Sequence, residues 1–351
     1  MRLCALRAAL SVNRDADGWV LHSPRAWLGT AFHRLIAARP ASEEEAASLW
    51  ESTVRQFAKL ASMHSLNARF ANPERWPGYF LMRQRSIASS VRAGRKAAGN
   101  RSRYKPVVHV SGSEQLLTAR NGRLAGRPDR FEDGIVTEFK SSLPSEAWSG
   151  AAAVIDGYWR QLRLYAVLIG ESGSWPSLAR IAASNGQVLE RGIVRPECDA
   201  EADQAVYGLE ILNRSLASGS AGSELASPSE AGCAECPYQA VCPAFWKWCA
   251  EADWPVLPEA AGRGRVVSAD AGSDGDVYSI SILLDGRLGR GGPQSLALRK
   301  SVHGDMTGSE PGTAIRIVAA RTWPDDRLGA DISTCVFRED DLPAIVCAGS
   351  E

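Results

Sequence analysis

The sequence has no excess of charge of either sign, because 40 lysines and arginines balance 40 aspartates and glutamates. Net charge therefore gives no general attraction to nucleic acid, and any such binding site must be local. No apolar run approaches the ~18 residues that suggest a membrane span, and the first residues lack the long apolar core of a signal peptide. The phosphate-binding pattern GxxxxGK[ST] is missing. We expect a cytoplasmic globular protein with no membrane association.

The chain is long enough for two domains. Its 351 residues and its hydrophobic content of 45% are sufficient to bury a core in each. Eight cysteines are present. In a reducing compartment, a cluster of cysteines indicates metal or redox chemistry before it indicates disulfides.

Patterns of helices and strands alternate through the first two thirds of the chain. The segment 42–63 has the clearest start signal, because Ser42 is followed three residues later by Glu45, as in a capping box. Helices are expected over 23–38, 42–63 and 145–170, and strands over 107–110, 115–118, 179–183 and 188–194. This succession predicts an α/β fold.

The last hundred residues differ from the rest in their predicted secondary structure. A Ser/Gly/Ala/Pro-rich connection at 215–232 leads into a group of cysteines. Short strands separated by turn residues are then expected near 264–269, 277–284, 295–300, 314–320 and 332–337. We predict one domain over 1–252 and a small all-β domain over 253–351, for which an OB-like barrel is one candidate and a sandwich another.

Residues 126–140, GRPDRFEDGIVTEFK, predict a β-hairpin with its turn at Asp133-Gly134, because a type I′ turn needs positive φ at both central positions. This register places Asp129 opposite Glu138 on one face of the sheet, with Lys140 two residues beyond. Like charges so placed are destabilising unless a cation lies between them. Mg²⁺ or Mn²⁺ would satisfy both carboxylates. A solvated cluster of surface salt bridges is the alternative.

A second local feature is basic. Residues 83–105 contain eight lysines and arginines and no acidic residue. Contacts with phosphates are the usual functional reason for charge of one sign, and Arg92, Arg95 and Lys96 are the candidate nucleic-acid ligands. A solvated helix face would show the same pattern.

The motifs in chain order resemble those of a known enzyme family. They are Gly29 to His33, Glu114, Gly126-x-x-Asp129, Glu138-x-Lys140, Gln161-x₃-Tyr165 and Cys233-x₂-Cys236-x₅-Cys242. This succession resembles the RecB-like branch of the PD-(D/E)XK nucleases, in particular its iron–sulfur members, the AddB-type nucleases and the CRISPR-associated exonucleases. The resemblance covers residues 1 to about 250. It implies a restriction-endonuclease-like fold, a mixed sheet flanked by helices.

The resemblance also implies roles for individual residues. His33, Asp129 and Glu138 would bind the metal ion, and Lys140 would orient the attacking water and steady charge on the phosphate. Gln161 and Tyr165 would support the site and contact the substrate. Glu114 corresponds to an additional acid of the preceding strand.

The resemblance assigns the cysteines to a [4Fe–4S] cluster. Cys4 is the only cysteine before the nuclease motifs, and with Cys233, Cys236 and Cys242 it would complete a set of four ligands. Such a set could also hold a tetrahedral Zn²⁺. Cys249 is an alternative to Cys4 as the fourth metal ligand.

The sequence therefore predicts a nuclease that hydrolyses phosphodiester bonds in DNA with Mg²⁺ or Mn²⁺, on single-stranded or end-exposed DNA, in repair, recombination or defence. One alternative is a DNA-binding accessory subunit of a helicase–nuclease complex with an inactive centre. Another is an interaction protein stabilised by zinc. The expected partners are DNA and a helicase or another recombination or repair protein.

Overall fold

The computed structural model describes residues 4–12, 19–63, 65–100, 115–145, 150–220, 222–234, 236–255, 257, 259–323 and 325–342. These residues pack as two compact units. Unit 1 comprises Arg25–Phe57 and Gly78–Arg214, and unit 2 comprises Arg2–Pro24, Ala58–Pro77 and Ser215–Glu351. Within the described residues, no helix is both long enough and apolar enough to cross a membrane.

Unit 1 is built on a four-stranded mixed sheet with the order β3-β4-β5-β6. The central pair β4 and β5 is parallel, and the two outer pairs are antiparallel. A separate two-stranded sheet precedes it. The strands are β1 Leu117–Ala119, β2 Leu124–Gly126, β3 Arg130–Glu132, β4 Ile135–Lys140, β5 Leu178–Ala183 and β6 Val188–Gly192; the helices are α2 Pro24–Ala38, α3 Glu43–Ser62, α4 Tyr79–Asn100, α5 Ala151–Glu171 and α6 Arg195–Ala217.

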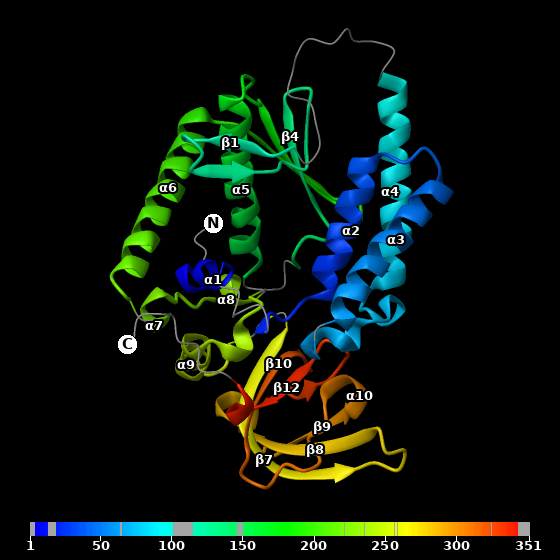
Figure 1. The fold of residues 1–351 in the computed structure, drawn as a ribbon, viewed down its shortest axis with the longest axis vertical. Coiled ribbons are helices and arrows are strands. Elements are labelled where there is room, and N and C mark those ends of the chain that lie inside the picture. Colours follow the sequence, from blue (N-terminus) through cyan, green and yellow to red (C-terminus); the bar gives the residue numbers. More distant parts are fainter. Residues whose placement is uncertain are drawn as a thin grey trace. The chain divides into compact units, whose positions relative to one another are not determined.

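Helices pack on both faces of this sheet. In Figure 1, β4 lies between α5 and α2. On the α5 face, Val136 and Ile181 of the sheet and Leu162 of the helix are fully buried together. On the opposite face, Phe139 of β4 meets Phe32 of α2 edge to face, with ring centroids 6.1 Å apart. Burial on both sides makes β4 a rigid support for the residues at its end.

The hairpin prediction is confirmed. β3 and β4 turn at Asp133 and Gly134, whose φ angles are 53° and 75°. Phe131 pairs with Val136, which is the register that the turn position predicts. Glycine at the second turn position avoids the steric cost of a positive φ, and the aspartate tolerates it.

The helices predicted over 23–38 and 42–63 are observed as α2 and α3. One bond of the capping box of α3 is present, because the Glu45 amide donates to Ser42 Oγ at 3.2 Å, whereas the Glu45 carboxylate accepts at 2.8 Å from the amide of Ala41 and not from that of Ser42. The helix predicted over 145–170 is observed as α5, which begins only at Ala151, and residues 146–149 of that prediction lie outside the described residues. The strand predicted over 107–110 also lies outside them.

Unit 2 is dominated by an antiparallel sheet with the order β11-β10-β7-β8-β9, in which β12 also pairs with β10. The sheet is nearly closed, because the Gln294 side chain of β9 accepts from the Leu328 amide of β11 and donates to the Asp326 carbonyl. The strands are β7 Ala260–Ala271, β8 Val277–Leu284, β9 Gln294–Arg299, β10 Ala314–Thr322, β11 Leu328–Gly329 and β12 Cys335–Arg338; the helices are α1 Ala5–Leu10, α7 Gly222–Leu225, α8 Glu230–Cys233, α9 Pro243–Glu251 and α10 Lys300–His303. All five strands predicted here are present, and an OB-like topology stays a prediction.

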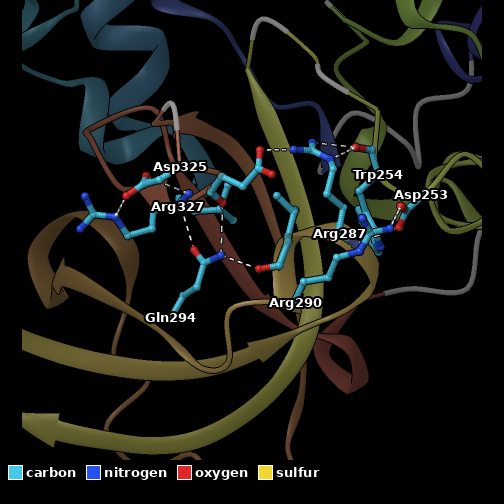
Figure 2. Close-up of polar contacts among 10 residues, drawn as sticks. Asp253, Trp254, Arg287, Arg290, Gln294, Asp325 and Arg327 are labelled. Atoms are coloured by element: carbon cyan, nitrogen blue, oxygen red, sulfur yellow. Dashed lines mark hydrogen bonds and ion pairs between the residues drawn. The ribbon is translucent and has the colours of Figure 1, made fainter.

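Arginines of the connection between β8 and β9 bind the segment that follows α9 (Figure 2). Arg287 donates to the Trp254 carbonyl at 2.8 Å and also contacts Asp326, and Arg290 pairs with Asp253. The segment that precedes α9 is bound as well, because Arg316 of β10 donates to the Ala240 carbonyl at 2.9 Å. Residues 215–255 therefore pack with the C-terminal sheet.

The compact units thus divide at a different place from the two domains expected from the sequence. We predicted a boundary at residue 252, but Ser215 already begins the part that packs with the C-terminal sheet. The N-terminal residues join the same unit, where the Leu21 amide donates to the Pro237 carbonyl at 3.1 Å. The functional division into a nuclease domain and a β domain stays a prediction.

Candidate active site

Three elements of unit 1 bring the predicted acidic residues and the histidine together. His33 on α2 faces Asp129, with 3.2 Å between His33 Nδ1 and Asp129 Oδ1. Asp129 lies directly before β3, and its Oδ2 accepts from the Phe139 amide of β4 at 2.7 Å. That bond holds Asp129 beside Glu138, the residue that precedes Phe139. The hairpin therefore places both carboxylates at one point, as its register predicted.

Glu138 is the most deeply buried acid of the site. Its residue is 3% exposed, and its Oε2 is buried with no hydrogen-bond partner among the described residues. Burial, followed by the negative charge of Asp129, raises the pKa of Glu138 to about 7, although Lys140 and His33 act in the opposite direction. A buried oxygen without a partner is costly in a protein, so this atom indicates a missing ligand.

His33 responds to the same carboxylates. Burial alone would lower its pKa, but the hydrogen bond and charge of Asp129, together with the charge of Glu138, raise it above the ordinary value. The carboxylates thus create a negative potential that attracts a cation.

Lys140 forms an ion pair with one of the two acids. Its Nζ is 2.7 Å from Glu138 Oε1. The Nζ also lies 4.2 Å from the ring centroid of Tyr158 on α5, a cation–π contact. Lys140 is therefore held between the acid and an aromatic ring.

Gln161 and Tyr165 lie together on α5, as their spacing predicts. Gln161 Nε2 donates to Tyr165 Oη at 2.8 Å. Burial, followed by the charge of Glu138, raises the pKa of Tyr165, so its hydroxyl is neutral and able to donate. Tyr158 was missed, although it lies three residues before Gln161 on the same helix face, a spacing that could have identified it.

The donors at this site suit a divalent cation chemically. Two carboxylates and an imidazole are ligands for Mg²⁺ or Mn²⁺, and Glu138 Oε2 has no other partner. Across the part of the chain that the structure describes, however, no three His, Cys, Asp or Glu side chains stand in a geometry that could hold a metal ion. Glu138 Oε1 faces Lys140, and His33 Nδ1 faces Asp129.

The predicted cysteine ligands all belong to unit 2. Cys4, at the start of α1, accepts from the Ser227 amide at 3.4 Å and lies 3.9 Å from the Leu225 carbonyl. Burial, followed by the neighbouring Cys236, Cys242 and Cys4, raises the pKa of Cys233 to about 11. The fold therefore brings Cys4 into the neighbourhood of the other three across more than two hundred residues, but it shows no cysteine group in metal-binding geometry among the residues described.

Cys249 lies in the same region. Burial raises its pKa to about 12, and the neighbouring Cys233 and Cys242 add to the rise. Cys4 and Cys249 thus both remain candidates for the fourth position.

Residues 83–100 of the basic segment belong to α4, and residues 101–105 lie outside the described residues. Arg92 and Arg95 are exposed there, whereas Arg83 pairs with Glu51 of α3 at 2.8 Å. The side chain of Lys96 and the whole of Glu114 lie outside the described residues.

A mixed sheet between helices, with a buried glutamate, an aspartate, a lysine and a histidine at one strand end, fits the class of phosphodiester hydrolases. The family model described as the PD-(D/E)XK nuclease superfamily matches residues 2–243, and the chain belongs to that superfamily. Its members are nucleases, and they typically use divalent metals such as Mg²⁺. No curated protein and no solved structure matches the chain. The RecB-like iron–sulfur branch stays a prediction.

Proposed function

We propose that this protein is a Mg²⁺- or Mn²⁺-dependent deoxyribonuclease that acts on single-stranded or end-exposed DNA in repair, recombination or defence. The observation that supports this most directly is Glu138, a buried acid with one unpartnered oxygen beside Asp129, His33 and Lys140. Such a group is expected at a cation site and has no structural use by itself.

His33, Asp129 and Glu138 would hold the cation, which supplies Lewis-acid activation of water and neutralises phosphate charge when bound. The Phe139 amide holds Asp129 Oδ2, and Asp129 Oδ1, which faces His33 Nδ1, would turn to the cation together with the imidazole. Lys140 would turn its ammonium from Glu138 toward the phosphate and steady the negative charge that develops there. Tyr165 would donate its hydroxyl proton as a hydrogen bond, since its raised pKa keeps it neutral.

The test is to incubate the purified protein with end-labelled single-stranded and double-stranded DNA, with Mn²⁺ and with a chelator. We expect metal-dependent shortening of the single strand and loss of that activity in Glu138→Gln. Cleavage that persists in the chelator, or in Glu138→Gln, would contradict the assignment.

We further propose that Cys4, Cys233, Cys236 and Cys242 hold a [4Fe–4S] cluster, with Zn²⁺ as the other metal such a set accepts. Support comes from the proximity of Cys4 to the three other thiols, which contributes to their raised pKa values. A helicase or another recombination or repair protein stays a predicted partner, because the sequence has no GxxxxGK[ST] motif of its own.

A further inference from the structure

A small cavity lies beside the candidate active site, between β2 and α5. Its volume is about 170 Å³. The walls are mainly apolar, and they include Leu124 and Gly126 from β2 and Gln161, Leu164, Tyr165 and Leu168 from α5. The four helix residues recur at intervals of three, one and three, so they form one continuous face of α5.

Gly126 allows β2 to lie close to this helix face. A Cβ atom at this position would come within 2.9 Å of Leu168 Cδ1 and 3.1 Å of Tyr165 Cε1. Any larger residue would therefore push into Tyr165 and narrow the cavity.

The cavity lies next to the candidate active site along α5. Gln161, which lines the cavity, follows Tyr158 by three residues on the same helix face, and the Tyr158 ring centroid is 4.2 Å from Lys140 Nζ. Gly126 is also only three residues before Asp129 in the chain. A nucleotide whose phosphate lies at the carboxylates would have its base within reach of this cavity.

We propose that the cavity receives one unpaired nucleobase of the strand that is cut. This rests on the proposed nuclease function and specifies its substrate. The volume is far below the ~300 Å³ of a site for a drug-sized molecule, so it suits one ring system and not a whole nucleotide. Leucines and a tyrosine contact the faces of a base without regard to its identity.

The polar groups of the cavity agree with this occupant. Gln161 donates one N–H to Tyr165, and its amide still has an oxygen acceptor and a second N–H donor for the edge of a base. A base in a duplex is stacked on both faces and paired along that edge, so it can enter only from a single strand or after being flipped out. The cavity therefore selects for unpaired DNA.

The test measures binding in a chelator, where no hydrolysis occurs. The probes are a short single-stranded thymidine oligonucleotide and an abasic oligonucleotide of the same length, which share phosphates but differ in bases. Wild type should bind the thymidine strand roughly fivefold or more tightly than the abasic strand, as expected for loss of base stacking. Leu164→Trp, which fills the cavity, should lose most of that preference, whereas the volume-conserving control Leu164→Met should keep it.

Gly126→Ala provides a second way to narrow the cavity if Leu164→Trp fails to fold, as judged by circular dichroism. An equal preference in the narrowed variant and in Leu164→Met would overturn the base site, and so would a wild-type protein that does not distinguish the two strands. Because no cleavage is measured, these results are independent of the nuclease assay. A protein that cuts DNA but fails this test loses only the base site.

Discussion

At the scale of single residues, the buried Glu138 makes metal binding depend on pH. Its pKa of about 7 without metal means that a proton competes with the cation in the acidic range. Apparent Mn²⁺ affinity should therefore fall as the pH drops below the neutral range, by about tenfold per pH unit for each ligand that takes up a proton. Glu138 and His33 both contribute, because the pKa of each is raised. Isothermal titration across this range measures the effect. A Mn²⁺ affinity that does not change between roughly pH 5 and pH 7 would mean that Glu138 is not a ligand.

Variants of the two acids and of Lys140 should have different effects on metal binding and on the rate of DNA hydrolysis. Asp129→Ala and Glu138→Ala remove proposed cation ligands, so both should lose Mn²⁺ binding and DNA hydrolysis while keeping the fold. Lys140→Met keeps the apolar stem on Tyr158 and removes only the ammonium, so it should bind Mn²⁺ and lose roughly 100-fold or more in rate. Titration calorimetry and a cleavage assay on the same preparations distinguish the two cases. Unchanged Mn²⁺ affinity in Asp129→Ala would refute the ligand assignment.

Arg130 should act on the site without touching its ligands. Its guanidinium lies 5.0 Å from the Phe139 ring centroid and contacts the Ile36 carbonyl of α2 at 3.5 Å, which joins the helix bearing His33 to the hairpin bearing Asp129. Burial, followed by the charge of Arg39, lowers the pKa of Arg130 to about 10, as expected for a cation enclosed between layers.

We therefore expect Arg130→Met to lower Mn²⁺ affinity as well as the free energy of unfolding, the latter by about 1–3 kcal/mol. Arg180→Met is the matched control, since Arg180 lies in the same row of the sheet but pairs with the exposed Glu190. Calorimetry and urea denaturation provide the two readouts. Equal losses of affinity in both variants would exclude a positioning role for Arg130.

At the scale of elements, the second half of α4 should bind DNA without regard to sequence. Replacing Arg92, Arg95 and Lys96 by glutamine should weaken binding to all single strands alike and flatten its salt dependence by roughly 0.7 log unit per lost contact. Arg83→Gln is the control, because Arg83 is paired with Glu51 and should contribute less. Fluorescence anisotropy at several salt concentrations measures the slope. A slope unchanged in the triple variant would identify this face as merely solvated.

At the scale of the whole molecule, the cysteines should connect distant parts of the chain. If they hold the proposed cluster, protein purified without oxygen should be brown and contain about four irons per chain. Cys4→Ala should lose iron and become sensitive to protease, because the N-terminal helix would be released from the later segment. Cys249→Ala should keep both iron and protease resistance.

The reverse pattern in these two variants would move the fourth ligand to Cys249, which lies near Cys233 and Cys242. Stoichiometric zinc in the anaerobic protein would replace the cluster by a zinc site. Iron analysis and limited proteolysis together decide between these outcomes.

The sequence by itself determined the features that depend on neighbouring residues. The Asp133-Gly134 turn set the hairpin register, and Ser42 with Glu45 marked the start of α3, because each depends on backbone preferences within a few residues. The period of the apolar residues located α5 and hence the Gln161–Tyr165 pair. The acid pair of the site followed from that register and from a resemblance that the family match supports.

Only the tertiary structure decided how these pieces meet. The contact of Lys140 with Glu138, the unpartnered Glu138 Oε2 and the enclosed Arg130 all result from helices packing on both faces of the sheet. The packing of the N-terminal segment against residues 215–255 likewise brings together positions more than two hundred residues apart in the chain. Such contacts depend on burial and on side-chain direction across distant segments, and local patterns in the sequence do not encode either.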